Sequence, residues 1–313
     1  MPITDPSLPI RFLDVLETTG LGFVVLHREA EIGKNSLGSD LDLAVEVHAD
    51  DVVRRTAGAL KEVGLLPVIR WPYDIGGAVT FFISTPEGEH GMQADLLHDP
   101  RGRGRYGLRT GELLKRAMIG KRYPVPDPLD ERLYLLHKRW CKGQTSALNL
   151  ELEKLHDEGD IEHAHDRVQD LFALQAARSI QLLLDGRSPK PNSAIFRFRH
   201  LPRQLRRAVS PIGYWVELMG PNSEGQKLTE DLRSRFEGWV IHLGSGARPS
   251  GPAGYQWWIR RVMPIRLRPG IFLSHSEARA HPSADLTLDW HPKMTVESIA
   301  GTVVEAMSAR VVP

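Results

Sequence analysis

The stretch Leu37-Gly-Ser-Asp-Leu-Asp-Leu-Ala-Val45 decides the fold of the first third of the chain. From residue 41 to residue 47, apolar and polar side chains alternate with a period of two, which is typical of a β-strand. The two faces of this strand carry different side chains: Leu41, Leu43 and Val45 on one, and Asp40, Asp42 and Ala44 on the other. Two carboxylates therefore share one face.

The residues around this strand predict a small sheet with helices. The patterns favour helices at 6–19 and 49–63, and strands at 22–28, 67–72, 77–85 and 89–97. A polar loop extends through Ser39, and the last three strands read as an antiparallel meander. We expect a mixed sheet with helices on one side, in an α/β or α+β fold.

A third carboxylate, Asp95, lies in the apolar strand segment Gln93-Ala-Asp-Leu-Leu97. An unpaired carboxylate is costly there unless a metal ion or a cation compensates it. Magnesium binds through a few carboxylates together with phosphate oxygens and water. If Asp42 and Asp95 lie on adjacent strands, they bracket one ion. Taken alone, Gly-Ser-Asp-Leu-Asp is also compatible with a turn whose acids cap it.

The rest of the chain predicts two further units. Three prolines within Tyr123–Pro128 break regular structure, residues 129–184 have a helical pattern, and 185–192 reads as a linker. In the last unit the predicted strands and helices alternate, which indicates a small parallel sheet: strands at 214–219, 239–243, 271–274 and 286–288, helices near 225–236, 255–263 and 295–310. The predicted domains are residues 1–124, 125–192 and 193–313.

Composition narrows the class of protein. The formal net charge of +1 implies no strong attraction of the whole protein to nucleic acid or to an anionic membrane. The single cysteine, Cys141, cannot form an internal disulfide, and the first twenty residues lack the apolar core of a signal peptide. No apolar run reaches the roughly 18 residues of a membrane span. We expect a cytoplasmic protein without a membrane partner.

The carboxylate pattern resembles the DNA polymerase beta superfamily of nucleotidyltransferases. That family has an Asp-x-Asp pair on one strand, a third Asp on a neighbouring strand and a Gly-Ser upstream. Asp40, Asp42 and Asp95 match the acids, and the resemblance covers roughly residues 1–140. Here Gly38-Ser39 directly precedes the acids and Leu26-His-Arg28 occupies the usual Gly-Ser position, as in a subgroup of bacterial members.

The resemblance implies a reaction. Asp40, Asp42 and Asp95 are expected to hold two Mg²⁺ or Mn²⁺ ions, with Asp95 binding the ion that activates the acceptor and accepting its proton. A nucleoside triphosphate is attacked in line at the α-phosphate by a small-molecule or sugar acceptor, and pyrophosphate leaves. Two alternatives remain open: transfer to RNA or protein, with the near-neutral charge weighing against RNA, and a non-catalytic nucleotide-binding or scaffold protein.

Further residues are candidates for contacts to the substrates, because cations balance a polyphosphate. The candidate nucleotide contacts are His27, Arg28, Lys34, Gly38, Ser39 and Lys138. Arg101, Arg103 and Arg105 follow Asp95 in a Gly-rich loop and are candidate contacts to phosphate or acceptor. For each cation the alternative is ordinary surface charge.

The segment Tyr214–Thr229 has the order strand, Gly-rich turn, helix. It resembles the phosphate-binding loop of P-loop kinases, and Gly220 and Gly225 match its glycines. Gln226 replaces the lysine that contacts phosphate, and Lys227 replaces the hydroxyl residue that binds magnesium. The tail resembles the closing strand and helix of small kinases of the adenylylsulfate-kinase and thymidylate-kinase group. We expect a shrunken, inactive kinase-like domain; the alternatives are a kinase using Lys227 in a shifted frame and a plain packing module.

Overall fold

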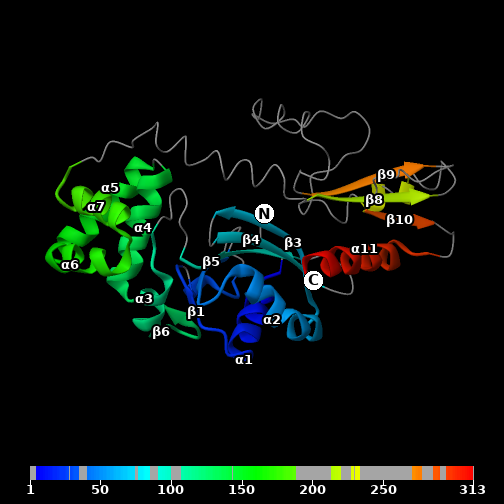
Figure 1. Cartoon of the computed structure of the whole chain (residues 1–313), viewed down its shortest axis with the longest axis horizontal. Helices are drawn as coiled ribbons and strands as arrows, with labels where there is room; N and C mark the ends of the chain where they lie inside the picture. The colour runs from blue at the N-terminus through cyan, green and yellow to red at the C-terminus, as the bar shows by residue number, and fades with distance from the viewer. Residues whose placement is uncertain are drawn as a thin grey trace.

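The computed structural model mixes helices and strands in three groups (Figure 1). It describes residues 5–27, 29–34, 41–74, 77–84, 91–99, 107–142, 144–187, 213–219, 227–228, 230–232, 270–276, 285–289 and 294–312. The helical group lies at one end of the molecule and the last three strands lie at the other, with the first sheet between them (Figure 1). The expected mixed helix-and-strand class is confirmed.

The first sheet has five strands in the order β1-β2-β5-β4-β3. The strands are β1 (Phe23–Val25), β2 (Leu41–Val45), β3 (Leu65–Asp74), β4 (Gly77–Ser84) and β5 (Gly91–Leu97). Only β2 and β5 run parallel; the other neighbouring pairs are antiparallel, so the predicted meander is confirmed. The parallel pair brings together two segments about fifty residues apart in the sequence.

Helices α1 (Ser7–Thr18) and α2 (Ala49–Glu62) cover one face of this sheet. They form because their apolar residues recur at helical spacing, and Asp50 and Asp51 in the first turn of α2 suit the positive end of the helix dipole. Their buried side chains pack with the apolar face of β2, and the rings of Phe12 and Phe82 lie 4.6 Å apart. The predicted division of β2 into two faces is confirmed for its described residues.

The other face of the sheet packs against helices. These are α3 (Thr110–Lys115), α4 (Pro128–Lys142), α5 (Thr145–Asp157), α6 (Ile161–Leu171) and α7 (Leu174–Leu184). Val24, Ala44 and Leu97 from the sheet share one buried cluster with the helices. The predicted helical stretch is confirmed as four consecutive helices, and Pro128 begins the first of them, where its missing N–H is not needed.

Some elements have no counterpart among the predicted ones: the short 3₁₀ helix η1 (Glu29–Glu31), α3, and a hairpin of β6 (Met118–Ile119) and β7 (Pro124–Val125). The expectation that the prolines of 123–128 exclude regular structure was wrong for Pro124 and Val125. A two-stranded hairpin leaves each strand one free edge, and proline is tolerated at such an edge. The predicted boundary between residues 124 and 125 falls inside β7.

The last group is a parallel sheet in the order β10-β8-β9, formed by β8 (Gly213–Met219), β9 (Gly270–Ser276) and β10 (Leu286–Asp289). The predicted parallel arrangement is confirmed for these strands; the strand at 239–243, the helix near 255–263 and the boundary at residue 192 lie outside the described residues. Helix α11 (Val296–Val311) begins at Thr295, whose hydroxyl accepts from Ser298 N at 3.2 Å. It shares a core with Leu66 and Val68 of β3 and with β8.

Candidate active site

Two buried carboxylates lie side by side on the parallel strands. In the pairing of β2 with β5, Asp42 is directly opposite Asp95. Paired residues of neighbouring strands point to the same face of a sheet, which here is the face opposite the α1–α2 core. Asp42 is 2% exposed and Asp95 is 5% exposed. The expectation that these two acids lie together on adjacent strands is confirmed.

Asp42 is also in contact with two basic side chains. Lys138, on α4, ion-pairs through Nζ with Asp42 Oδ2. His27, directly after β1 and Leu26, has its Nε2 2.6 Å from the same oxygen. The Lys138 and His27 nitrogens are 2.9 Å apart. The structure therefore brings together two of the predicted nucleotide contacts and one predicted metal ligand.

The His27 Nε2 atom can serve only one of its two neighbours at a time. If it carries the proton, it donates to Asp42 Oδ2; if it does not, it accepts from the Lys138 ammonium. His27 follows the end of β1, next to the start of β2 on the neighbouring strand. There the backbone N–H of Leu26 donates to Asp42 O at 3.0 Å. This extra backbone bond fixes His27 beside the carboxylate.

Helix α4 presents more than Lys138 to this region. Glu131, Tyr134 and Lys138 recur at helical spacing, so they share one side of α4. The Tyr134 ring stacks with His27 at 6.5 Å between centroids, and Lys138 Nζ lies 5.6 Å from the Tyr134 centroid. Burial raises the pKa of Glu131, and the charge of His27 opposes that shift. Sequence reasoning missed Glu131 and Tyr134, although their spacing from Lys138 could have indicated them.

Asp95 has a neighbour on its own strand. Gln93, two residues earlier and therefore on the same face, donates from Nε2 to Asp95 Oδ1 at 3.4 Å. This amide was not predicted as part of the site. Its spacing from Asp95 is the sequence signal that could have indicated it.

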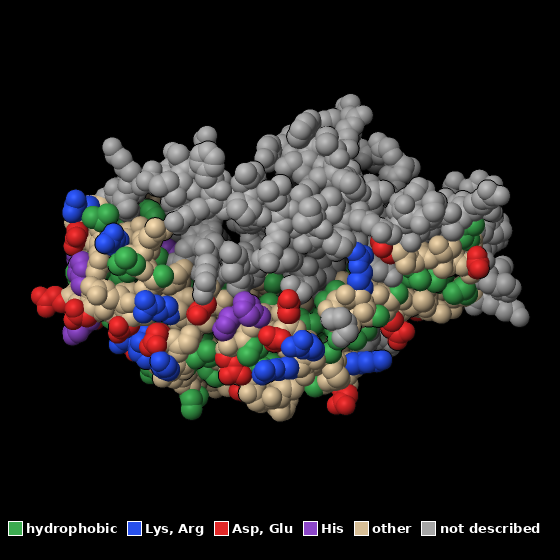
Figure 2. All heavy atoms as spheres, viewed as in Figure 1, with side chains coloured by type: hydrophobic (Ala, Val, Ile, Leu, Met, Phe, Trp, Pro, Cys, Tyr) green, Lys and Arg blue, Asp and Glu red, His purple; other side chains and the backbone are tan. Residues whose placement is uncertain are grey.

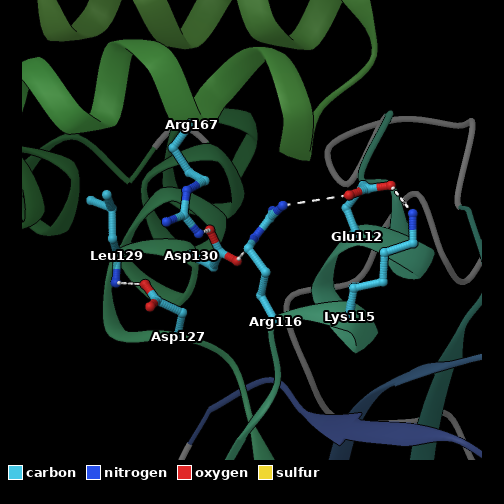
Figure 3. Close-up of polar contacts among 7 residues, drawn as sticks. All are labelled: Glu112, Lys115, Arg116, Asp127, Leu129, Asp130 and Arg167. Atoms are coloured by element: carbon cyan, nitrogen blue, oxygen red, sulfur yellow. Dashed lines mark hydrogen bonds and ion pairs between the residues drawn. The ribbon is translucent and has the colours of Figure 1, made fainter.

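The junction of α3, α4 and α6 holds α4 against the rest of the helical group (Figure 3). Arg116 Nε donates to Asp130 Oδ2 at 2.9 Å, and Arg167 Nη1 donates to Asp130 Oδ1 at 3.1 Å. Asp130 is fully buried. Burial raises the pKa of Asp130, and the hydrogen bond from Arg116 acts in the opposite direction. Because Asp130 and Lys138 belong to the same helix, this junction also positions Lys138.

His137, seven residues after Asp130 and therefore on the same side of α4, also anchors this helix. It is buried against Phe172 and Trp140, with ring centroids 5.1 Å and 6.0 Å away. Burial lowers the pKa of His137 to about 4, so the imidazole is neutral at pH 7. Asp130 and His137 thus tie one side of α4 to the helical group, and Lys138 ties α4 to Asp42.

The other predicted contacts are not part of this cluster. Lys34 is exposed after the short helix η1 (Glu29–Glu31), and within the described residues no side-chain hydrogen bond or ion pair joins it to either carboxylate. Lys227 is exposed at the start of a helical segment. Several predicted residues lie outside the described residues: Arg28, Gly38, Ser39, Asp40, Arg101, Arg103, Arg105, Gly220, Gly225 and Gln226.

The chemistry of the donors suits a hard divalent cation. Carboxylate oxygens on two hydrogen-bonded strands are the ligand type that Mg²⁺ and Mn²⁺ prefer. Among the residues that the structure describes, no group of three or more His, Cys, Asp or Glu side chains is placed to hold a metal ion. The described residues include two of the three predicted ligands, Asp42 and Asp95, and the third is Asp40.

No protein-family model matches the chain, and no curated protein matches it. Across the described ranges, no helix has both the length and the apolar character that a bilayer crossing requires. The candidate site therefore depends on its own geometry and chemistry.

Proposed function

We propose that the chain is a metal-dependent nucleotidyltransferase with a polymerase-beta-type catalytic sheet. It transfers a nucleoside monophosphate from a nucleoside triphosphate to a hydroxyl or phosphate of a small-molecule or sugar acceptor and releases pyrophosphate. One observation carries the proposal: Asp42 and Asp95 are buried, opposite one another, on parallel strands. A fold without use for two adjacent carboxylates gains nothing by burying them together, because like charges repel.

The proposed roles follow from the contacts. Asp42 and Asp95, together with Asp40, would hold Mg²⁺ or Mn²⁺. A bound divalent ion supplies charge stabilisation for the polyphosphate and lowers the pKa of the acceptor hydroxyl. Lys138 and His27 lie beside Asp42 and can donate to phosphate oxygens. The buried surroundings exclude water, which strengthens each of these interactions.

A small acceptor fits the charge of the molecule better than a nucleic acid does. A formal net charge of +1 gives little long-range attraction to a polyanion, whereas nucleic-acid binding depends on many basic contacts to phosphates. In the coloured part of Figure 2, Lys, Arg, Asp and Glu side chains are interspersed rather than gathered by sign. We propose a cytoplasmic enzyme acting on a soluble acceptor.

The test is pyrophosphate release by the full chain with each nucleoside triphosphate, Mg²⁺ and a panel of hydroxyl and phosphate acceptors. Asp42→Asn and Asp95→Asn should each abolish release while circular dichroism shows a retained fold. Asp51→Asn is the matched control, since Asp51 is a partly exposed aspartate of α2 that pairs with Arg54. Turnover retained in Asp95→Asn would contradict the proposal.

One observation favours a second candidate, a non-catalytic nucleotide-binding or scaffold protein. Lys138 neutralises Asp42 in the described structure, and a buried ion pair can be a purely structural contact. In that case no triphosphate is consumed under any condition, and Asp42→Asn lowers only the stability of the fold. Pyrophosphate release above the Asp42→Asn background excludes this second candidate.

For residues 193–313 we propose a kinase-like domain without transfer activity. The parallel order β10-β8-β9 with α11 at the end of the chain supports it, as does the replacement of the expected lysine by Gln226. Lys227→Ala should leave pyrophosphate release unchanged. A loss of phosphoryl transfer in that variant would instead favour the shifted-frame kinase.

A further inference from the structure

Lys138 is an unusual neighbour for a proposed metal ligand. Its side chain is 8% exposed, and its ammonium lies on Asp42 Oδ2, the oxygen that also has His27 Nε2 at 2.6 Å. An ammonium and a divalent cation seek the same oxygen. The position on this carboxylate oxygen is therefore taken by a charge that belongs to the chain itself.

The surroundings explain why such a charge is needed. A buried carboxylate is strongly destabilising when nothing compensates it, and Asp95 beside Asp42 adds a second negative charge. The ion pair with Lys138 reduces this repulsion within the protein. A divalent ion would supply the same compensation, after which the ammonium next to it would be repelled.

Lysine is able to leave this position without moving its helix. Its charge is carried on a flexible four-carbon stem, whereas α4 itself is fixed by Asp130 at the α3–α4–α6 junction and by buried His137. A short rotation of the stem can separate Nζ from Oδ2 while the backbone stays in place. The oxygens of a polyphosphate are the natural new partners for the released ammonium.

We propose that Lys138 is an internal counter-cation that occupies Asp42 in the metal-free protein and that a divalent ion displaces it. The inference rests on the proposed function, because it requires Asp42 to be a metal ligand. Its consequence is that metal binding is weakened until Lys138 has another anion to contact. Free divalent ion alone therefore binds poorly, and binding improves when the competing ammonium is removed.

The experiment measures the binding of Mn²⁺ alone to the full-length chain, by the electron paramagnetic resonance signal of the free ion. Lys138→Met should bind Mn²⁺ about tenfold more tightly than the unmodified protein, because a competing positive charge is gone. Lys138→Arg keeps the charge and should stay within about threefold of the unmodified protein. Lys154→Met is the control, since Lys154 is a half-exposed lysine on α5 that pairs with Glu151.

The outcomes separate this inference from the proposed function. Mn²⁺ binding that Asp42→Asn abolishes but that Lys138→Met leaves unchanged or weakens overturns the counter-cation and leaves the proposed function standing. If neither the unmodified protein nor Lys138→Met binds Mn²⁺, both the counter-cation inference and the proposed function are overturned. If Lys138→Met does not fold, Lys138→Gln replaces it, and a larger rise of its thermal midpoint with Mn²⁺ than that of the unmodified protein supports the inference. An equal or smaller rise contradicts it.

Discussion

The β2–β5 region around Asp42 and the α3–α4–α6 junction around Asp130 each bury a carboxylate almost completely. At the junction, the guanidiniums of Arg116, directly after α3, and Arg167, on α6, donate to the two oxygens of Asp130, at 2.9 Å and 3.1 Å (Figure 3). In the β2–β5 region, one ammonium and one imidazole share a single oxygen of Asp42, and Asp95 lies alongside.

The two kinds of cation suit different tasks. A guanidinium is a rigid fork that fixes the geometry of its partner, and two of them tie three helices to one carboxylate. An ammonium is a mobile point charge. In the β2–β5 region, Asp95 beside Asp42 adds a second negative charge that packing of the fold does not require. We infer that Asp130 serves the fold and that Asp42 serves binding and chemistry.

Activity gives the largest expected contrast between the two aspartates. Asp42→Asn should lower pyrophosphate release on the order of 1000-fold, because charge stabilisation worth several kcal/mol is lost from the transition state. Asp130→Asn should stay within about threefold at a temperature well below its unfolding midpoint, as expected for a site that holds helices. Initial rates at saturating triphosphate check both. Equal losses in the two variants would break the comparison.

For stability we expect the opposite order, with Asp130→Asn more damaging than Asp42→Asn. Asp130→Asn should lower the free energy of unfolding by about 3 kcal/mol, since it leaves two guanidiniums without their buried partner. That value is at the low end for a broken buried pair, because Arg116 and Arg167 are 23% and 28% exposed and can be rehydrated. Urea denaturation measures it. The comparison fails if Asp42→Asn costs more stability than Asp130→Asn.

Helix α4 connects the β2–β5 region with the α3–α4–α6 junction. The pKa of His137 gives a way to test whether burial of this ring anchors α4. Its pKa falls from 6.5 to about 4 on folding, so the unfolded chain takes up a proton that the folded chain refuses. This contribution to stability is complete above pH 6.5 and decreases as the pH falls toward 4, by about 3 kcal/mol in all.

The measurement compares urea denaturation of the unmodified protein with that of His137→Gln between pH 7 and pH 4, the range set by the pKa of His137. Raised carboxyl pKa values such as those of Asp130 and Glu131 act with the opposite sign, and both proteins retain them. The difference between the two profiles therefore isolates His137. Parallel profiles would show that its ring is not held in a dry environment.

The sequence predicted most of the first sheet because its signals are local. Alternation along Leu41–Val45 determined the faces of β2, and the apolar neighbours within Gln93–Leu97 made the charged Asp95 conspicuous. The pairing of Asp42 with Asp95 could be expected only as adjacency. Their alignment depends on the hydrogen-bond register between two distant segments, which no local pattern encodes.

The rest of the site could not be predicted because it depends on tertiary packing. Lys138 was one of several candidate cations, and its contact with Asp42 arises from the docking of α4 on the sheet. Glu131 and Tyr134 share its side of α4, but a helix shows the spacing without showing which side faces a carboxylate. The hairpin at Pro124 was missed because, besides its own strand pairing, it is held by contacts with β1 and by Glu29, which are distant in the sequence.

Asp14, a partly exposed carboxylate, supplies the smallest expected effect and the reference for the buried Asp42 and Asp130. The Tyr123 hydroxyl donates to Asp14 Oδ1 at 2.8 Å, and Arg122 also contacts Asp14, which is 41% exposed. Tyr123→Phe should lower the free energy of unfolding by about 1 kcal/mol near pH 7, as for one ordinary hydrogen bond. Burial raises the pKa of Tyr123 above its usual 10.0, so the unmodified protein should lose stability as the pH rises beyond 10.0, and the variant should lose less. Urea denaturation near pH 7 and above pH 10.0 measures both effects. As a control, Tyr123→Phe should leave pyrophosphate release unchanged. A loss as large as that of Asp130→Asn would mean that exposure does not distinguish these carboxylates, and the contrast drawn between the two buried regions would then have to rest on activity alone.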